Sequence, residues 1–561
     1  LGAKFFNEEN IIVLPEKPYN PKEEISVFTA KAVETKNGEV VLSQTEDKAK
    51  IEITNFDGEG LITPRCRNWI NNCLKTEERG NSFQIRMPFL KGVLHTVNFH
   101  AFLRDKGVKK GLVFVTDAFG IQRDLMKANI IIRPSMFKLF SLIKDKNIAP
   151  DLMKYYFEKI QLYNHGIYVV KTEKSFHSTQ FVNLSSQQLS TFDLDKNQID
   201  EIFKEHIDLA DAFCPDNLVD PTKRPELFMV EDKTDWMKLL LKEPRFIKDP
   251  HIKTTLKNHR VSRYNDIALG RVLVRGEIRF LSGDLYYFLL DLLKRVAGDN
   301  TELLATYKQI KKARLYKGGA YLPGGAKDGR RIALVRSPHL SRNEDVGTTV
   351  FYKDEYNKYL GHLNGVIMTG DHSFIPAALG GADFDGDTIS IIYDKRIIHA
   401  CFKSGYVETK TKESLVPFIH IQELKGSSPI EKYNYVSSQA VYNTFSNRIG
   451  NISNAAMKIA AVEYDEAIMK NENTPKAALC TILTGNEIDA TKKGVRPYID
   501  SVIHFDSQLD DEAKQVVKEI TDYIKMKREI EKTMGNIPRV KKEDSALVLN
   551  DSELPVTSFN P

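Results

Sequence analysis

Three aspartates within five residues constrain this chain more than any other feature of its sequence. The segment GGADFDGDTISIIYD (380–394) places Asp383, Asp385 and Asp387 directly before an alternating apolar run, which is typical of a β-strand. In an extended segment residues two apart share one face, and Gly386 permits a tight turn, so the three carboxylates can converge on one point. The fold must therefore hold three like charges together beside a strand.

The cluster indicates a metal site. Three carboxylates held close together repel one another, and a bound divalent cation removes that repulsion. Ligands that are all oxygen favour Mg²⁺ or Mn²⁺ over zinc. Because Mg²⁺ keeps positions for water and phosphate oxygens, Asp383, Asp385 and Asp387 predict a centre for phosphoryl or nucleotidyl transfer.

Two other interpretations of the cluster were weighed. A solvated acidic turn fits poorly, because Phe384 and the apolar flanks AAL and ISII indicate a neighbouring core. A calcium-binding EF-hand loop requires glycine at its sixth position and a helix after it. Here glycine is the fourth residue and a strand follows, so this interpretation is also disfavoured.

Length and composition indicate a large globular protein. With 561 residues the chain exceeds one ordinary core, and its 42% hydrophobic and 28% charged residues are typical of folded proteins. A net charge of +5 is compatible with a local basic cleft but does not by itself imply nucleic acid. No apolar run is long enough to cross a bilayer and no leader is evident, so we expect a cytoplasmic protein without membrane contact.

Hydrophobic periodicity divides the chain into two β units separated and followed by helices. We expect an N-terminal segment over 1–46, which the absence of an initial Met suggests is truncated, and a first barrel-like unit over 47–140. A helical connector over 141–316 precedes a second β unit over 317–400 that carries the aspartates. A helical region follows over 401–561, with one long helix over about 433–470.

Several motifs in the same order resemble the two-barrel RNA polymerases. DFDGD resembles their D-x-D-G-D signature, and upstream stand FDGEGLITP (56–64), FQIRMPFLKGVL (83–94), RPSMFK (133–138) and VRSPHLSRNEDV (335–346). Downstream, NRIGNISNA (447–455) and EIDATKKG (487–494) also resemble family segments. This superfamily comprises cellular multi-subunit RNA polymerases, eukaryotic silencing RNA-dependent RNA polymerases and single-chain phage enzymes such as the YonO-like and crAss-like polymerases.

The resemblance implies the fold and the roles of the acidic residues. It predicts an α+β protein with two double-psi β-barrels joined and flanked by helical segments. Asp383, Asp385 and Asp387 would be the catalytic residues and the ligands of Mg²⁺, or of Mn²⁺, on the second barrel. The long helix would correspond in position to the bridge helix of a polymerase cleft, with Gly450 as a bending point or a close contact.

Four basic residues are candidates for binding NTP or RNA. Lys91 stands in the K-G motif, where its ammonium can neutralise a triphosphate; the alternative is an ordinary lysine at a strand end. The family's second lysine falls here on Phe83, so Arg86 or Lys138 is expected to replace it. Arg336, before a proline-bounded turn, can contact a phosphate or a 2′-hydroxyl.

The predicted function is Mg²⁺-dependent, template-directed nucleotidyl transfer from NTPs to an RNA 3′-hydroxyl. The run over 275–300 resembles the DNA-dependent enzymes, so we prefer a phage-type DNA-directed RNA polymerase acting in a bacterial host cytoplasm. The alternative is a silencing-type RNA-dependent RNA polymerase, and a metal-dependent nuclease is more remote. The expected partners are a DNA or RNA template, the RNA product and NTPs, with no evident protein partner.

Overall fold

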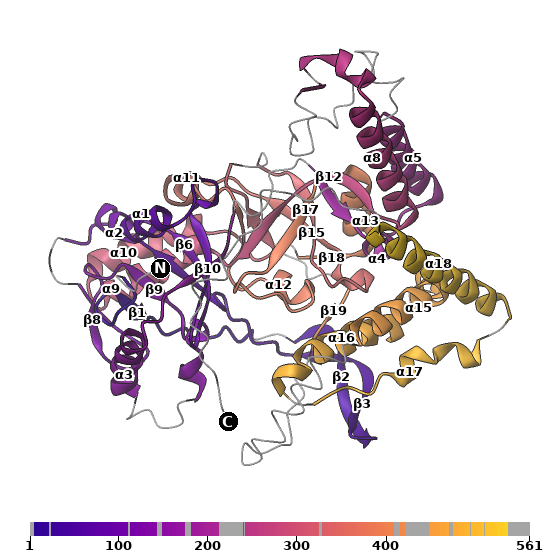
Figure 1. Cartoon of the computed structure of the whole chain (residues 1–561). Helices are drawn as coiled ribbons and strands as arrows, with labels where there is room; N and C mark the ends of the chain where they lie inside the picture. The colour runs from indigo at the N-terminus through magenta and orange to yellow at the C-terminus, as the bar shows by residue number, and fades with distance from the viewer. Residues whose placement is uncertain are drawn as a thin grey trace.

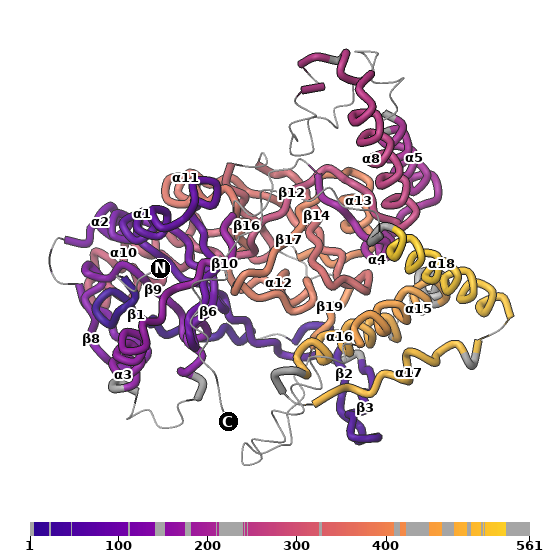
Figure 2. Tube along the Cα trace, in the orientation of Figure 1, coloured from indigo at the N-terminus to yellow at the C-terminus, as the bar shows by residue number. Residues whose placement is uncertain are grey.

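Two β-sheets lie side by side at the centre of the protein, with helices around them (Figure 1). The computed structural model describes residues 5–21, 24–109, 111, 113–142, 149–173, 181–212, 239–240, 242–324, 328–408, 416–421, 448–470, 475–493, 495–509 and 511–536. The chain passes from the first sheet to the second and then to the C-terminal helices, as the colours of Figure 2 show. Helices α5 and α8 project from the second sheet.

The first sheet has six strands from the N-terminal part of the chain. In spatial order they are β1 (Ile11–Val13), β9 (Ile130–Ile132), β4 (Glu59–Ile62), β6 (Leu90–Thr96), β5 (Ser82–Met87) and β10 (Tyr168–Thr172). The pairs β1–β9 and β4–β6 are parallel, and the other three pairs are antiparallel. Met87 and Leu90 close a two-residue hairpin loop in which Phe89 has φ 56°, a left-handed conformation that glycine adopts more readily.

The second sheet contains a closed ring of six strands. The ring consists of β12 (Val272–Ser282), β16 (Val366–Thr369), β13 (Gly319–Tyr321), β15 (Val346–Val350), β14 (Arg331–Val335) and β17 (Thr388–Ile392). The pairing of β12 with β17 closes it. Two further strands, β11 (Phe181–Leu184) and β18 (Tyr406–Val407), pair with β12 and β15.

The two sheets have the same topology. If the strands of each are numbered from one to six along the chain, both have the spatial order 1-5-2-4-3-6. The five pairs shared by the two orders are parallel or antiparallel in the same sequence. The expected fold class, α+β with two double-psi β-barrels joined and flanked by helices, is confirmed.

The sheets include strands outside the ranges predicted for the two barrels. Strand β1 lies in the predicted N-terminal segment, while β10 and β12 lie in the predicted helical connector. Short strands of three to five residues, such as β1 and β10, give little periodic signal. The hairpin of β2 (Ile25–Lys36) and β3 (Glu39–Ala49) pairs instead with β19 (Phe418–Ile419). The predicted division into domains stays a prediction.

Helices cover both sheets. Around the first sheet and the connection are α1 (Pro64–Cys73), α2 (Phe99–Asp105), α3 (Ala149–Leu162), α4 (Ser186–Thr191), α5 (Lys196–Ala212) and α8 (Pro250–Ala268). Between and after the strands of the second barrel come α9 (Leu285–Ala297), α10 (Thr301–Ile310), α11 (Asp354–Leu360), α12 (Ile375–Ala378) and α13 (Lys395–Ser404). The C-terminal region contains α15 (Ile449–Lys470), α16 (Pro475–Lys493), α17 (Asp500–Ile503) and α18 (Asp511–Asn536).

The predicted bridge-like helix is described only in part. Residues 433–447 lie outside the described residues, and α15 begins at Ile449. Gly450 therefore stands near the start of the described helix, and a Cβ atom there would have no heavy atom within 4 Å among the described neighbours. The close-contact interpretation of Gly450 is not supported. No helix among the described residues has the length and apolar character needed to span a membrane.

Helix α9 joins the two barrels through a shared core. Its apolar residues pack in one cluster with Leu61 and Val93 of the first sheet and Val366 and Met368 of the second. Asp284 caps the helix by accepting hydrogen bonds from the backbone N–H groups of its first turn. The relative position of the two barrels is therefore fixed by buried apolar contacts.

The first prediction concerns the pH dependence of this helix cap. Burial, and secondarily the charge of Asp371, raise the pKa of Asp284 to about 7. The folded protein thus holds a proton that the unfolded chain releases near pH 4. Because the folded state binds more protons over this range, the contribution of Asp284 to the free energy of unfolding falls as pH rises from about 4 to 7. Asn keeps the cap and removes the charge.

We expect Asp284→Asn to gain melting temperature relative to the parent as pH rises from 5 to 8. Between pH 5 and about 7, each pH unit should lower the free energy of unfolding of the parent relative to the variant by about 1.4 kcal/mol. The exposed Asp299→Asn, which also removes one carboxylate, is the control measured at the same pH values. If the melting temperatures of the Asp284 variant and the parent change with pH by the same amount, the raised pKa of Asp284 is contradicted.

Candidate active site

The three aspartates occupy the loop between α12 and β17 of the second barrel. The loop is held by its own backbone: the Asp385 N–H donates to Asp383 Oδ1 at 3.2 Å, and the Asp383 N–H donates to Asp387 Oδ2 at 3.1 Å. Phe384 points the other way into the core of the second barrel. Gly386 has φ 132°, so the tight turn expected from the sequence is present.

The first sheet supplies a cation and an amide to this loop. The Lys91 ammonium on β6 forms an ion pair with the Asp385 carboxylate. On the neighbouring strand β5, Gln84 Nε2 donates to the Asp385 carbonyl at 3.1 Å. Alternate residues of these strands fill the core below, so Gln84 and Lys91 lie on the face directed at the aspartates.

The second barrel supplies another cation. Arg336 follows β14, and its Nη2 lies 3.0 Å from Asp387 Oδ2. Its Nη1 donates to the carbonyls of Leu379 and Gly380 at 3.2 and 3.1 Å, so the guanidinium is fixed against the start of the aspartate loop. The structure therefore places Arg336, which was predicted to bind NTP or RNA, beside Asp387.

A glycine turn of the first sheet packs directly on the aspartate loop. The Asp57 carbonyl accepts a hydrogen bond from the Phe384 N–H at 2.9 Å. Gly58 has φ 85°, and a Cβ atom there would lie 2.4 Å from Asp385 Cβ. Ser135 Oγ accepts from the Gly58 N–H at 2.9 Å, so the RPSM motif supports the turn.

Four of these residues were not predicted from the sequence, namely Gln84, Asp57, Gly58 and Ser135. Each falls inside FDGEG, FQIR or RPSM, whose order was the available signal. Their groups are an amide, a carbonyl, a glycine backbone and a hydroxyl, which occur throughout any protein. A sequence pattern alone therefore does not identify them as site residues. Their function depends on which loop of another barrel they face, and this becomes visible only in the fold.

The carboxylates differ in their electrostatic environment. Burial, together with the negative charges of Asp385 and Asp387, raises the pKa of Asp383 to about 7. Burial alone would raise the pKa of Asp385 as well, but the hydrogen bond and charge of Lys91, with a contribution from Lys138, hold it below its ordinary value. Repulsion within the cluster is therefore concentrated on Asp383.

The arrangement was tested for a divalent cation. Among the described residues, no group of three or more His, Cys, Asp or Glu side chains is placed so as to hold a metal ion. Asp385 faces Lys91 while Asp387 faces Arg336, so the convergence of the three carboxylates on one cation stays a prediction. The donor set of three carboxylates, with uncompensated repulsion at Asp383, still fits Mg²⁺ or Mn²⁺ in its chemistry.

The other two basic candidates lie nearby. Lys138 is exposed and acts electrostatically on Asp385, and its N–H donates to the Phe89 carbonyl at 2.8 Å. Arg86 is exposed on β5, directly opposite Lys91 in the antiparallel pair with β6. The structure therefore brings Lys91, Lys138 and Arg336 close to the aspartates and leaves Arg86 one strand further away.

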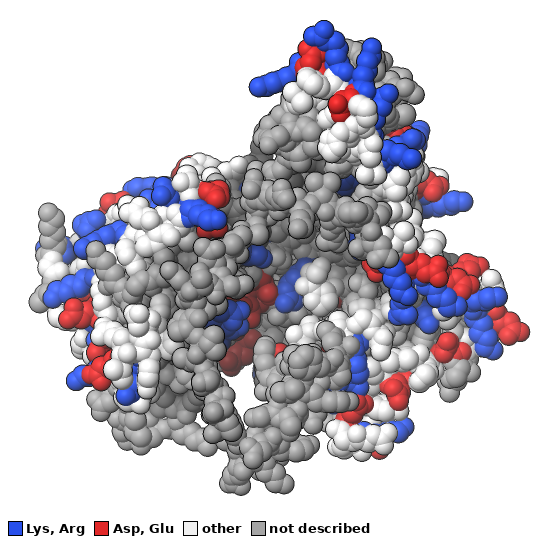
Figure 3. All heavy atoms as spheres, viewed as in Figure 1, with Lys and Arg blue, Asp and Glu red and all other residues white. Residues whose placement is uncertain are grey.

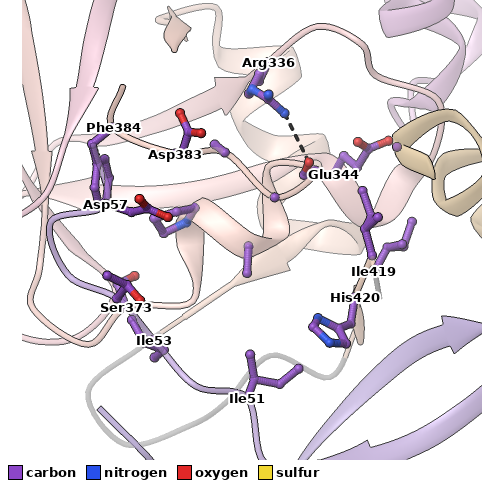
Figure 4. Close-up of a pocket in the computed structure, with 18 of the residues that line it drawn as sticks. Ile51, Ile53, Asp57, Arg336, Glu344, Ser373, Asp383, Phe384, Ile419 and His420 are labelled. Atoms are coloured by element: carbon purple, nitrogen blue, oxygen red, sulfur yellow. Dashed lines mark hydrogen bonds between the residues drawn. The ribbon is translucent and has the colours of Figure 1, made fainter. Parts of the chain in front are cut away.

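A cavity of about 520 Å³ opens beside the aspartate loop (Figure 4). Asp57, Asp284, Arg336 and Asp383 contribute polar groups to its wall. Its other side includes apolar residues from β19 and from the segment between β3 and β4, namely Ile51, Ile53 and Ile419. Figure 3 shows acidic side chains in a hollow near the middle of the molecule, with basic side chains on both sides.

Comparisons with known proteins were made on this basis. Residues 328–544 match the family model of RNA dependent RNA polymerase. This range covers less than half of the chain and contains the aspartate loop, Arg336 and the C-terminal helices. A search of curated proteins found no match.

One solved structure is similar to this chain over most of its length. It is the RNA dependent RNA polymerase QDE-1 from Thielavia terrestris, with 14% sequence identity and a TM-score of 0.46. The similarity covers 88% of this chain and 53% of that chain, so this chain spans about half the length of that polymerase. The family match supports the expected RNA polymerase superfamily, and it shows neither the phage-type members nor a DNA template.

The second prediction tests the close contact of the two barrels. Gly58 and Gly38 both have left-handed φ angles, 85° and 80°, but a Cβ atom at Gly38 would meet nothing within 4 Å among the described residues. Alanine strains the backbone at both positions by about 1 kcal/mol. Only Gly58→Ala also displaces Asp385.

We therefore expect Gly58→Ala to weaken Mn²⁺ binding by at least about tenfold, as loss of a group that orients metal ligands does. Calorimetric titration of Mn²⁺ measures this affinity. Gly38→Ala, with equal backbone strain, should bind Mn²⁺ as the parent does. Equal affinities for the two alanine variants would show that the contact at Gly58 does not position the site.

Proposed function

We propose that this chain catalyses template-directed RNA synthesis from nucleoside triphosphates, with RNA as the template. In each step the 3′-oxygen of an RNA strand forms a bond to the α-phosphorus of an NTP. The bond from that phosphorus to the bridging oxygen breaks, pyrophosphate leaves, and the 3′-hydroxyl proton passes to water. The observation that carries the proposal is the aspartate loop of one barrel enclosed by Lys91 and Gln84 of the other.

The roles of the residues follow from their charge and position. Asp383, Asp385 and Asp387 would hold Mg²⁺, which when bound activates a hydroxyl and stabilises a departing pyrophosphate. Lys91 and Arg336, which pair with Asp385 and Asp387 in the structure, would face phosphate oxygens once those carboxylates held the metal. Lys91 and Lys138 then neutralise the triphosphate from the first sheet, while Arg336 holds a phosphate or sugar from the second.

RNA is the better-supported template. The match to the RNA dependent RNA polymerase family model lies over the catalytic barrel, whereas the resemblance to DNA-dependent enzymes was confined to residues 275–300. In the structure that run forms β12 and α9, which complete the barrel and the shared core. It therefore has a structural role that does not depend on the template.

The third prediction concerns the central aspartate. Asp385→Asn keeps the size of the side chain and removes its charge, so Mg²⁺ and Lys91 both lose a partner. We expect NTP incorporation into RNA to fall by at least about a hundredfold, since even groups that merely orient metal ligands cost 10- to 100-fold. Incorporation of labelled NTP with Mg²⁺ measures this. Asp299→Asn, an exposed carboxylate, should retain parental activity, and an active Asp385→Asn protein would refute the proposal.

The fourth prediction separates the templates and the remaining alternative. With equal concentrations of single-stranded RNA and DNA of the same sequence, the parent should incorporate NTPs complementary to the RNA at a rate at least about tenfold higher. The reverse preference would restore the DNA-directed interpretation. A metal-dependent nuclease would instead shorten the oligonucleotide without NTP and release no pyrophosphate.

A further inference from the structure

Two exposed aromatic side chains flank the basic residues of the first sheet. Phe89 is 54% exposed in the β5–β6 loop, and Tyr168 is 68% exposed on β10, the highest value among the large hydrophobic residues described. Large aromatic side chains usually bury most of their surface. Neither position was assigned a role by the sequence motifs or by the proposed function.

Tyr168 belongs to a cross-strand row that begins at the aspartate loop. Tyr168 pairs with Arg86 in the antiparallel pair β10–β5, and Arg86 pairs with Lys91 in the pair β5–β6. Residues directly opposite each other in antiparallel pairs share one face of the sheet. Asp385, Lys91, Arg86 and Tyr168 therefore follow one another along a line. Two strand spacings separate Tyr168 from Lys91, roughly 10 Å, or about three stacked bases at about 3.4 Å each.

Phe89 is held outward by a fixed backbone. The loop is anchored on both sides, because the Pro88 carbonyl accepts a hydrogen bond from the Tyr156 hydroxyl and the Phe89 carbonyl accepts one from the Lys138 N–H. Phe89 nevertheless has φ 56°, which is unfavourable for a side chain of this size. Backbone strain in a well-anchored loop beside a reactive centre points to a functional role of the side chain.

Charge and aromatic character together indicate the occupant. The row of Lys91, Arg86 and Tyr168 lies beside the β5–β6 loop, where Lys138 contacts Phe89. Together they combine positive charge with two exposed rings, a combination by which proteins bind single-stranded nucleic acid through phosphate contacts and base stacking. Because the row ends at Asp385, the bound strand must be one whose end reaches the reactive centre.

We propose that Phe89 and Tyr168 are stacking platforms for the unpaired 3′-terminal nucleotides of an RNA strand, whose phosphates contact Arg86, Lys91 and Lys138. This inference rests on the proposed function for the role of the RNA end but not for its binding. Stacking on Phe89 orders the nucleotide next to the aspartates, and Tyr168 holds one about three bases upstream. Both are positioning residues, since the rings touch bases rather than the reacting phosphorus.

The chain offers a variant that separates stability from binding. Glycine is favoured at the φ angle of Phe89, so Phe89→Gly removes the ring without adding backbone strain. Its melting temperature should equal or exceed that of the parent. For the strand position, Tyr168→Val keeps a residue suited to β-structure, and Tyr168→Phe keeps the ring. Phe246→Ala is the matched control, because Phe246 is 42% exposed beside α8, in the helical projection away from the two sheets (Figure 1).

The experiment measures binding of a fluorescent eight-nucleotide oligouridine by anisotropy, without NTP. Stacking of one base is worth about 1–3 kcal/mol, so Phe89→Gly and Tyr168→Val should each weaken binding by about 5- to 150-fold. Tyr168→Phe and Phe246→Ala should bind as the parent does. In primer extension the two weakened variants should show a raised KM for the RNA primer.

Parental affinity of both Phe89→Gly and Tyr168→Val would overturn the inference, as would an equal loss in Phe246→Ala. These outcomes are distinct from failure of the proposed function. If the parent binds the oligonucleotide but incorporates no NTP, the polymerase proposal fails while the RNA-binding face is still supported.

Discussion

The ion pair between Lys91 and Asp385 is the contact on which the rest of the site depends. It joins a strand of one barrel to a loop of the other, and the Gln84 amide and the Gly58 turn reinforce the same junction. Neither partner could be placed by local structure alone. The shared core around α9 sets the distance between the barrels, and glycine at position 58 permits the close approach. The geometry of the candidate site is therefore a property of the packing between two β units.

The acidic half of the site was accessible from sequence because its chemistry is local. Asp383, Asp385 and Asp387 lie within one loop before one strand, so their spacing already implied proximity. Arg336 and Lys91 were identified from family motifs, and the structure places both against these carboxylates. The convergence of all three carboxylates on one metal ion stays a prediction, and the pattern did not reveal that two of them face different cations.

The fold was predictable in outline and not in detail, for related reasons. Long helices such as α9 and α18 have a strong period and a clear boundary, and they appear where the sequence indicated. Strands β1 and β10 have three and five residues and join the sheet through partners far away in sequence. Their membership depends on long-range pairing, which single-sequence periodicity does not report. For the same reason Tyr168 had no visible link to Lys91 until register placed them in one row.

The common topology of the two barrels relates the acidic and the basic residues of the site to each other. In the second barrel the connection between its fifth and sixth strands carries the aspartates, and in the first barrel the same connection carries Ser135 and Lys138. One architecture thus presents acidic groups in one copy and a basic group in the other. Opposite electrical signs on matching scaffolds therefore meet where the two barrels pack against each other.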